Sequence, residues 1–296
     1  MEIEKRRVYA IVDFDALDQN VQAMEEKLPQ DVGMMAVIKT NAYGHGAKAI
    51  AKHLEDNDRI SGYAVATAEE ALELRKAGIG KMILILGYVF EKDYEDLILQ
   101  DIRFGIYRKD VAQALDAAAE KCHKKALIRY PVCQESVEEI KEIAGLKHLC
   151  LEGIFTHFAR ADEADKSYAK KAYSLFKDMI GALQKEDITF PICHCCNSAA
   201  ILELPGYHEN MVRAGITLYG LWPSEEMDHA FPLHPILSLY SHIVHIKTLP
   251  AGSAISYGGT YVTERESRIA TIPVGYGDGY PRSLSSKGYV LVRGKP

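Results

Sequence analysis

Residues 34–46, MMAVIKTNAYGHG, join a short apolar run to a polar segment that follows it directly. The run Met34–Ile38 has the length and composition of a strand buried on both faces, and Lys39 stands where it ends. Further runs of this kind recur along the chain, with amphipathic helical patterns between most of them: Gly62–Ala66, Met82–Leu86, Ile102–Ile106, Ala126–Ile128, Leu151–Thr156, Phe190–Cys193 and Met211–Arg213. Eight strands that alternate with helices predict an α/β fold, a closed parallel (β/α)8 barrel of the TIM type.

The segments between these strands carry helix start and stop signals. Thr67–Glu70 (TAEE) has the capping-box pattern that opens a helix, and Gly78 is placed to end that helix. Ser136–Glu139 (SVEE) repeats the pattern ahead of Gly145. An open doubly wound sheet is the alternative, but no GxGxxG segment follows the first strand.

The pattern changes after about residue 230, where strands follow one another without helices. The predicted strands of this second, β-rich domain are Leu237–Thr248, Ala254–Val262, Ile269–Val274 and Tyr289–Val292, with Arg7–Phe14 as a possible N-terminal addition. The predicted domains are therefore a barrel over residues 15–230 and a β-rich domain over residues 1–14 plus 231–296. Because its last strand lies so close to Pro296, we expect the β-rich domain to be incomplete there.

Composition narrows the class of protein. The chain has 296 residues, 48% of them hydrophobic, and a net charge of −6, which argues against a nucleic-acid-binding surface. Its N-terminus lacks the apolar stretch of a signal peptide, and no apolar run is long enough to span a membrane, so we expect a cytoplasmic protein. The CHCC segment at Cys193–Cys196 lacks the paired spacing of a structural zinc site, and no metal is predicted.

Polar residues stand at the carboxyl ends of several predicted strands, which is where barrels of this kind carry their active sites. The set consists of Lys39, His157, His194, Asn197, Ser198, Arg213 and Gly215. The loops after the seventh and eighth strands, with Ser198 and the backbone N–H groups of Gly215 and Ile216, suit a phosphate, and Tyr43 could close that pocket. A lysine beside a phosphate site indicates a phosphorylated aldehyde cofactor held as an imine.

Several segments together resemble, in order, the motifs of the alanine racemase family, whose members combine a barrel with a β-domain and use pyridoxal 5'-phosphate. They are AVIKTNAYGHG (36–46), FTHFARAD (155–162), CHCCNSAA (193–200), MVRAGITLYGL (211–221), ISYGGTY (255–261) and PVGYGDGYPR (273–282). The last two favour the racemases over related decarboxylases. The resemblance implies L- and D-alanine as substrates and a role in supplying D-alanine for the cell wall.

The resemblance also implies roles for single residues. Lys39 would hold the cofactor and act as one base, and Tyr257 of a second subunit would be the other, so the active unit would be a homodimer with shared sites. Arg213 would face the pyridine nitrogen, with His194 behind it. Tyr43, His157, Ser198, Gly215 and Ile216 would contact the cofactor, and His194 and Asn197 would support those residues from behind. Tyr276 and Arg282 would line the substrate entrance.

Two departures from the family pattern leave alternatives open. The fifth predicted strand runs straight into Arg129 without the family's Asp-Thr-Gly-Met segment, so Arg129 is a candidate remnant of a substrate-binding arginine. The family's late C-terminal segment is also absent before Pro296. Serine racemisation, cofactor binding without turnover and an amino-acid decarboxylase are the alternatives, although no decarboxylase motif is found.

Overall fold

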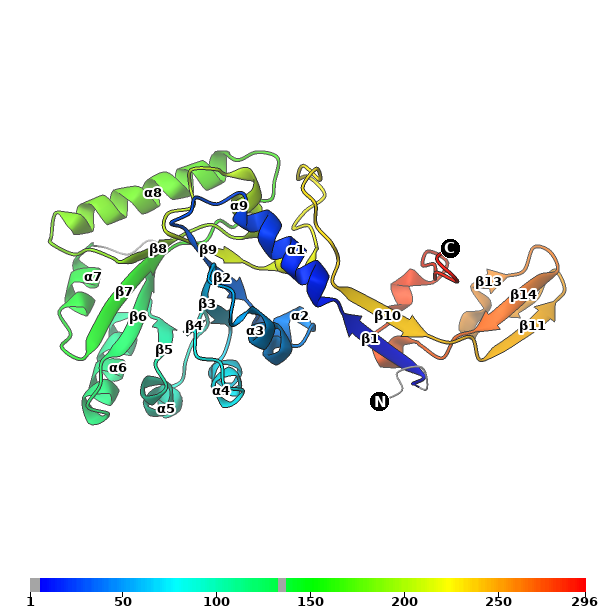
Figure 1. Cartoon of the computed structure of the whole chain (residues 1–296), viewed down its shortest axis with the longest axis horizontal. Coiled ribbons are helices and arrows are strands. Elements are labelled where there is room, and N and C mark those ends of the chain that lie inside the picture. Colours follow the sequence, from blue (N-terminus) through cyan, green and yellow to red (C-terminus); the bar gives the residue numbers. More distant parts are fainter. Residues whose placement is uncertain (1–5, 133–136) are drawn as a thin grey trace. The chain divides into compact units, whose positions relative to one another are not determined.

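The computed structural model describes residues 6–132 and 137–296, which form two compact units. One unit consists of Asp13–Ile236, and the other combines Met1–Val12 with Leu237–Pro296. The predicted division lay at residues 14/15 and 230/231, whereas the contacts within the chain change at 12/13 and 236/237. Figure 1 shows the elements of both units, coloured along the sequence.

The larger unit is a closed barrel of parallel strands, as predicted, with the strands in the order of the sequence. These strands are β2 (Gly33–Val37), β3 (Ile60–Val65), β4 (Met82–Ile85), β5 (Ile102–Gly105), β6 (Ala126–Pro131), β7 (Leu149–Phe155), β8 (Ile192–His194) and β9 (Met211–Ala214). β9 pairs with β2 and closes the ring. Met35, Val37, Ala64, Leu84 and Met211 pack together in a buried apolar cluster drawn from these strands.

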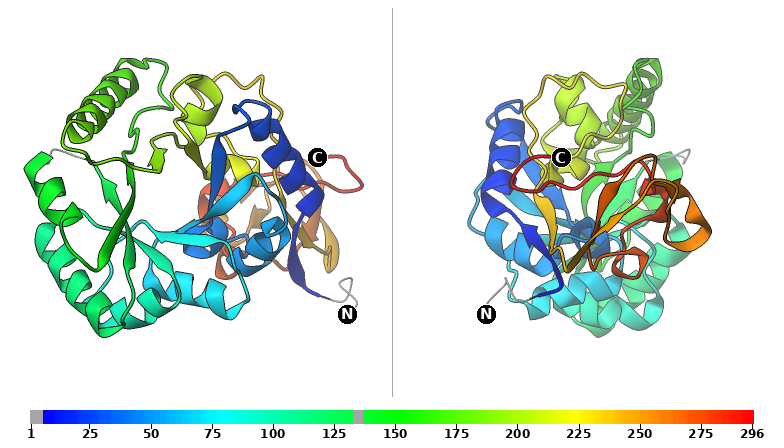
Figure 2. Two further views of the ribbon diagram at one scale, coloured as in Figure 1. Left: turned by 60° about the vertical axis from the view of Figure 1, so that its left-hand side comes forward. Right: turned by 90° about the vertical axis from the view of Figure 1, so that its right-hand side faces the viewer.

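Helices surround the strands, as the left view of Figure 2 shows for the cyan and green part of the chain. They are α1 (Phe14–Glu25), α2 (Lys39–Tyr43), α3 (Ala47–Leu54), α4 (Ala68–Lys76), α5 (Tyr94–Leu99), α6 (Lys109–Lys121), α7 (Val137–Ala144), α8 (Ser167–Gln184) and α9 (Ser198–Glu203). No helix in residues 6–132 or 137–296 is long and apolar enough to cross a membrane.

The prediction of a three-residue fifth strand was wrong. β6 continues through Arg129 and Tyr130 to Pro131 and pairs with β7 along its whole length, with a shift of register between Ile128 and Arg129. Arg129 and Tyr130 are both buried, although neither continues the apolar run Ala126–Ile128. Hydrophobic periodicity therefore could not locate this half of the strand.

The predicted capping box of α4 forms only in part. The Thr67 hydroxyl accepts the Glu70 N–H at 3.3 Å, as a helix cap should. The Glu70 carboxylate, however, does not accept the Thr67 N–H, as the second half of a capping box requires. It accepts the N–H groups of Ala66 and Thr40 at 2.7 and 2.5 Å. The second predicted cap, Ser136, lies outside the described residues, and α7 is described from Val137 onward.

The smaller unit is β-rich, as predicted, and the N-terminal strand belongs to it. β1 (Val8–Val12) pairs antiparallel with β10 (Leu237–Ser241). Two further antiparallel pairs follow: β11 (His245–Leu249) with β14 (Ser267–Thr271), and β12 (Ala254–Ile255) with β13 (Tyr261–Val262). Residues 289–292, predicted as a strand, form only an isolated bridge from Val292 to Lys295.

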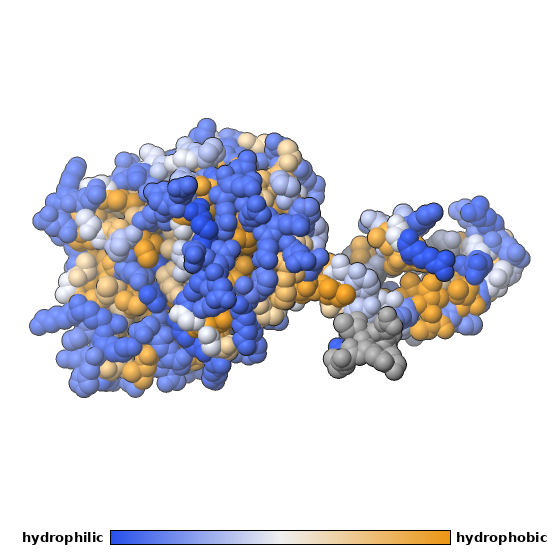
Figure 3. Space-filling view, in the orientation of Figure 1, coloured by the Kyte–Doolittle hydropathy of each residue, from blue (hydrophilic) through white to orange (hydrophobic). Residues whose placement is uncertain are grey.

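Large hydrophobic side chains are exposed over this unit, and hydrophobic residues are visible on its surface in Figure 3. They include Leu237, Leu239, Tyr240, Ile243, Val244, Ile246, Tyr261, Val262 and Tyr289–Val292. Contiguous apolar surface of this kind marks a region that packs against another chain segment or another molecule.

Candidate active site at the carboxyl rim of the barrel

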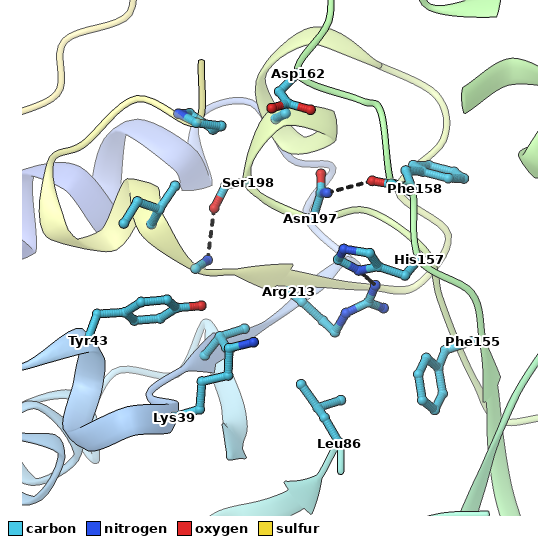
Figure 4. A pocket seen from close by; sticks show the side chains of 16 residues that line it. Lys39, Tyr43, Leu86, Phe155, His157, Phe158, Asp162, Asn197, Ser198 and Arg213 are labelled. Carbon is cyan, nitrogen blue, oxygen red and sulfur yellow. Dashed lines mark hydrogen bonds between the residues drawn. The ribbon is translucent and has the colours of Figure 1, made fainter. Parts of the chain in front are cut away.

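A cavity of about 520 Å³ opens at the carboxyl ends of the strands. It contains most of the residues expected from the sequence, because parallel strands in a barrel end at one rim (Figure 4). The expected residues that line it are Lys39, Tyr43, His157, Asn197, Ser198, Arg213, Gly215 and Ile216. The fold thus brings together side chains that lie at or beyond the carboxyl ends of β2, β7, β8 and β9 and are far apart in the sequence.

Lys39 begins a left-handed turn. Thr40, Asn41, Ala42 and Tyr43 all have φ between +52° and +55°, and none of them is glycine. An L-residue in this conformation costs roughly 1–2 kcal/mol, so several in a row persist only where their surroundings hold them. The turn brings Lys39 and Tyr43, four positions apart, to the same side of the cavity (Figure 4).

Arg213 lies at the base of the cavity, with its guanidinium almost fully surrounded by acceptors. Nη1 donates to Nδ1 of His194 at 2.5 Å and to the His194 carbonyl at 3.2 Å. Nη2 donates to the carbonyls of Thr156 and Cys195 at 2.8 and 3.1 Å and lies 3.2 Å from Nδ1 of His157. Burial lowers the pKa of Arg213 to about 10, which leaves it protonated at neutral pH.

The two histidines beside Arg213 are held neutral. Burial, together with the positive charges of Arg213 and Lys39, lowers the pKa of His157 to about 4. His194 is fully buried, and its pKa lies well below the usual range because of burial and of its two arginine neighbours, Arg213 and Arg129. Neither imidazole therefore adds positive charge to the site.

A second part of the cavity combines hydroxyl groups with the starts of two short helical turns. The Ser198 hydroxyl accepts the Gly215 N–H at 3.0 Å and lies 3.0 Å from the Thr217 hydroxyl. Asn197 caps α9 through the Ala200 N–H and donates to the Phe158 carbonyl at 2.9 Å. Backbone N–H groups at such turn starts attract anions.

Sequence reasoning missed several residues that line the cavity: Leu86, Phe155, Phe158, Ala159, Asp162, Ala199 and Pro223. Leu86 and Phe155 stand at or just beyond the ends of β4 and β7, the same positional signal that identified Lys39. Asp162 lies on the loop after β7 and shows no strand-end signal. Its place at the cavity follows from the path of that loop.

Four predicted residues lie elsewhere. Arg129 is fully buried inside the barrel and is not among the residues that line the cavity. Its guanidinium contacts His194, Glu152 and the sulfur atoms of two methionines. Tyr257, Tyr276 and Arg282 belong to the β-rich unit, where Tyr257 is 85% exposed and Tyr276 is 70% exposed.

In the CHCC segment, the side chains of His194, Cys195 and Cys196 contact a backbone carbonyl and two arginines. The Cys195 and Cys196 sulfurs lie 3.0 and 3.1 Å from the Tyr207 carbonyl, and both ring nitrogens of His194 face arginines. In the part of the chain that the structure describes, no group of three or more histidine, cysteine or acidic side chains is arranged to hold a metal ion.

The sequence and the fold are both similar to those of known proteins. The family profile described as "Alanine racemase, N-terminal domain" matches residues 12–223, and "Alanine racemase, C-terminal domain" matches residues 236–296. The chain is 39% identical to the alanine racemase of Desulforamulus reducens over 98% of this chain and 82% of the relative. It is 41% identical to that of Halothermothrix orenii over 98% of this chain and 79% of the relative. A solved alanine racemase of Clostridium difficile 630, described as a complex with cycloserine, superposes with a TM-score of 0.89 at 39% identity, covering 94% of this chain and 75% of that one.

Proposed function

The chain belongs to the alanine racemase family and interconverts L- and D-alanine, and we propose that it does so with pyridoxal 5'-phosphate bound in the rim cavity and with Lys39 as one catalytic base. The observation that carries this proposal is the placement of one primary amine, Lys39, in the same cavity as the Arg213 guanidinium and the Ser198 hydroxyl beside the Gly215 N–H. Serine racemisation is not favoured, because the relatives described above are alanine racemases.

The donor set of the cavity fits this cofactor. The Ser198 hydroxyl, which the Gly215 N–H holds in place, and the Ile216 N–H suit a phosphate, and the Lys39 amine suits an imine to an aldehyde. Arg213 has donors and no acceptor, so it suits a ring nitrogen that stays unprotonated. When bound, pyridoxal phosphate supplies an electron-withdrawing system that lowers the energy of a carbanion at the substrate α-carbon.

The residues of the chain must then move one proton on each face of the α-carbon. A base on one side cannot serve both faces of a planar centre, so racemisation needs two. We assign the Lys39 amine to one face. Tyr257 is the candidate for the other face because its segment, ISYGGTY, resembles the family motif that carries the second base, and its exposed phenol is consistent with that role.

We further propose that a second copy of the chain supplies that Tyr257. The exposed hydrophobic side chains of the β-rich unit support self-association, since a contiguous apolar surface is stabilised when it is covered. In such a homodimer each cavity would be completed by Tyr257, Tyr276 and Arg282 of the partner. The proposal predicts that mixtures of two inactive variants regain activity.

The described cysteines are unpaired thiols, which supports a reducing compartment, and we propose the cytoplasm. D-alanine for cell-wall assembly is the corresponding product. Neither nucleic acid nor membrane is a proposed partner.

Cofactor binding without turnover is the remaining alternative to be tested, and it makes a different prediction from racemisation.

The deciding experiment incubates the full chain and pyridoxal phosphate with L-alanine in D2O and follows α-proton exchange and D-alanine. We expect both with the wild type, and a loss of about a thousandfold or more in Lys39→Ala. Lys48→Ala, which removes an exposed lysine from α3, is the matched control and should leave the rate unchanged. Visible cofactor absorbance without exchange would support the non-catalytic alternative, and faster turnover of L-serine would contradict alanine as the substrate.

A further inference from the structure

The Glu70 carboxylate joins two chain segments that flank Lys39. Its Oε1 accepts the Thr40 N–H at 2.5 Å, and Thr40 is the residue immediately after Lys39. Its Oε2 accepts the N–H of Ala66, the first residue beyond β3, at 2.7 Å. β3 pairs with β2, the strand that leads to Lys39. One side chain on α4 therefore fastens the Lys39 turn to the neighbouring strand end.

This contact replaces the one that the local sequence favours. In a capping box, a glutamate at this position accepts the N–H of the capping residue, here Thr67. The contact from Glu70 to the Thr67 N–H is not formed, although the Thr67 hydroxyl still accepts the Glu70 N–H. Capping of α4 therefore does not explain why the Glu70 side chain points toward Thr40 and Ala66.

The Lys39 turn needs such support because its four left-handed residues, Thr40 to Tyr43, are each in a conformation that L-residues avoid. The Asn41 side chain accepts the Ala47 N–H at 2.9 Å, and His45 Nδ1 donates to the Ala42 carbonyl at 2.8 Å. These two contacts hold the far end of the turn. Glu70 holds the near end, directly beside Lys39.

We propose that Glu70 is a positioning residue for Lys39. By holding the Thr40 N–H, its carboxylate keeps the left-handed turn in place and fixes the direction from which the Lys39 amine enters the cavity. Both atoms that face it are N–H donors, so a carboxylate, which has acceptors only, suits the position better than an amide, whose NH2 group would oppose one donor. The catalytic consequence rests on the proposed role of Lys39 as a base.

Three variants test the proposal. Glu70→Ala removes both contacts, and Glu70→Gln keeps an acceptor for one N–H group while preserving size. Glu69→Ala is the matched control. It removes the same charge from the first turn of α4, but the Glu69 side chain is exposed, and the structure shows it interacting with Thr67 and not with Thr40.

The first measurement needs no activity: hydrogen exchange of backbone amides in the full chain without cofactor. We expect exchange in residues 39–46 to accelerate about tenfold or more in Glu70→Ala, because a hydrogen bond to a charged group is lost there. Glu70→Gln should be intermediate and Glu69→Ala unchanged. Equal protection of residues 39–46 in Glu70→Ala and the wild type would overturn the proposal.

The second measurement is steady-state racemisation with saturating pyridoxal phosphate. A displaced base slows proton transfer more than it weakens alanine binding, so we expect kcat to fall about tenfold or more with KM within about twofold. The order of kcat should be Glu69→Ala above Glu70→Gln above Glu70→Ala, and an equal loss in Glu69→Ala would contradict the proposal. If the wild type does not racemise alanine, the exchange experiment still decides whether Glu70 holds the turn.

Discussion

Arg213 and His194 form the shortest polar contact between side chains in the candidate site, 2.5 Å from Nη1 to Nδ1. On the opposite side of the same ring, Nε2 lies 3.2 Å from Nη1 of Arg129. A neutral imidazole accepts at one nitrogen only, and an arginine can only donate. The shorter distance indicates that Nδ1 is the acceptor, so Nε2 carries the proton and Arg129 faces an N–H group. Arg213 is thereby held by the ring, and Arg129 is left poorly satisfied.

Stability should fall in mild acid because His194 stays neutral in the folded chain. A histidine titrates near pH 6.5 when unfolded, and burial keeps the folded pKa of His194 well below that. Below about pH 6.5 the unfolded state therefore binds more protons, and folding weakens by up to about 1.4 kcal/mol per pH unit for such a group. His157, whose pKa burial lowers to about 4, acts in the same direction.

Urea unfolding between about pH 5 and pH 8 checks this prediction. His194→Asn should be less stable at neutral pH but should lose less stability on acidification. His123→Asn is a suitable control, because His123 is exposed and asparagine tolerates its φ of +52°. Identical pH slopes in the wild type and His194→Asn would contradict the assignment.

Replacing Tyr257 by phenylalanine should separate the two faces of the substrate. Lys39 would still exchange the α-proton of one enantiomer with D2O, whereas exchange of the other enantiomer would fall with the loss of its base. Racemisation should drop by about 10²–10⁴-fold. Tyr261→Phe, which changes another exposed tyrosine of the β-rich unit, should have little effect. Equal loss of exchange from L- and D-alanine would argue against the two-base assignment.

Ser198→Ala should weaken binding of the cofactor through its phosphate only. The variant loses the hydroxyl that organises the Gly215 and Thr217 backbone beside the proposed phosphate position. We expect affinity for pyridoxal phosphate to fall about tenfold, the value of one good hydrogen bond to a charged group. Affinity for pyridoxal, which has no phosphate, should stay the same in an absorbance titration. A similar loss for both ligands would show that the hydroxyl acts elsewhere.

The buried Arg129 should make the barrel dependent on Glu152. Arg129 is fully buried, its Nε has no partner within the described residues, and the Glu152 carboxylate at 3.3 Å is the acid it contacts. Glu152→Ala leaves that charge uncompensated and should cost about 3–5 kcal/mol of unfolding free energy. The double variant Arg129→Met with Glu152→Ala should recover most of the loss, measured by urea unfolding. A double variant as unstable as Glu152→Ala would refute this explanation.

The barrel, the β-rich second unit and most of the rim residues were predictable from sequence patterns. Strand and helix periods are local properties, and in a parallel barrel the residue after each strand is carried to one rim whatever the rest of the chain does. Lys39, His157, Ser198 and Arg213 were found in this way and line one cavity. The family motifs predicted the same residues from their order along the chain.

The places of Arg129, Glu70 and the left-handed turn depend on tertiary contacts and were not predictable from sequence patterns. Arg129 was expected near the substrate but fills the barrel interior, because β6 continues through it and places its side chain beneath His194. Glu70 was expected to cap its own helix but reaches Thr40 instead. Each outcome depends on a contact between segments that are distant in sequence, where packing and hydrogen-bond partners outweigh local preference. Local sequence patterns cannot predict such partners.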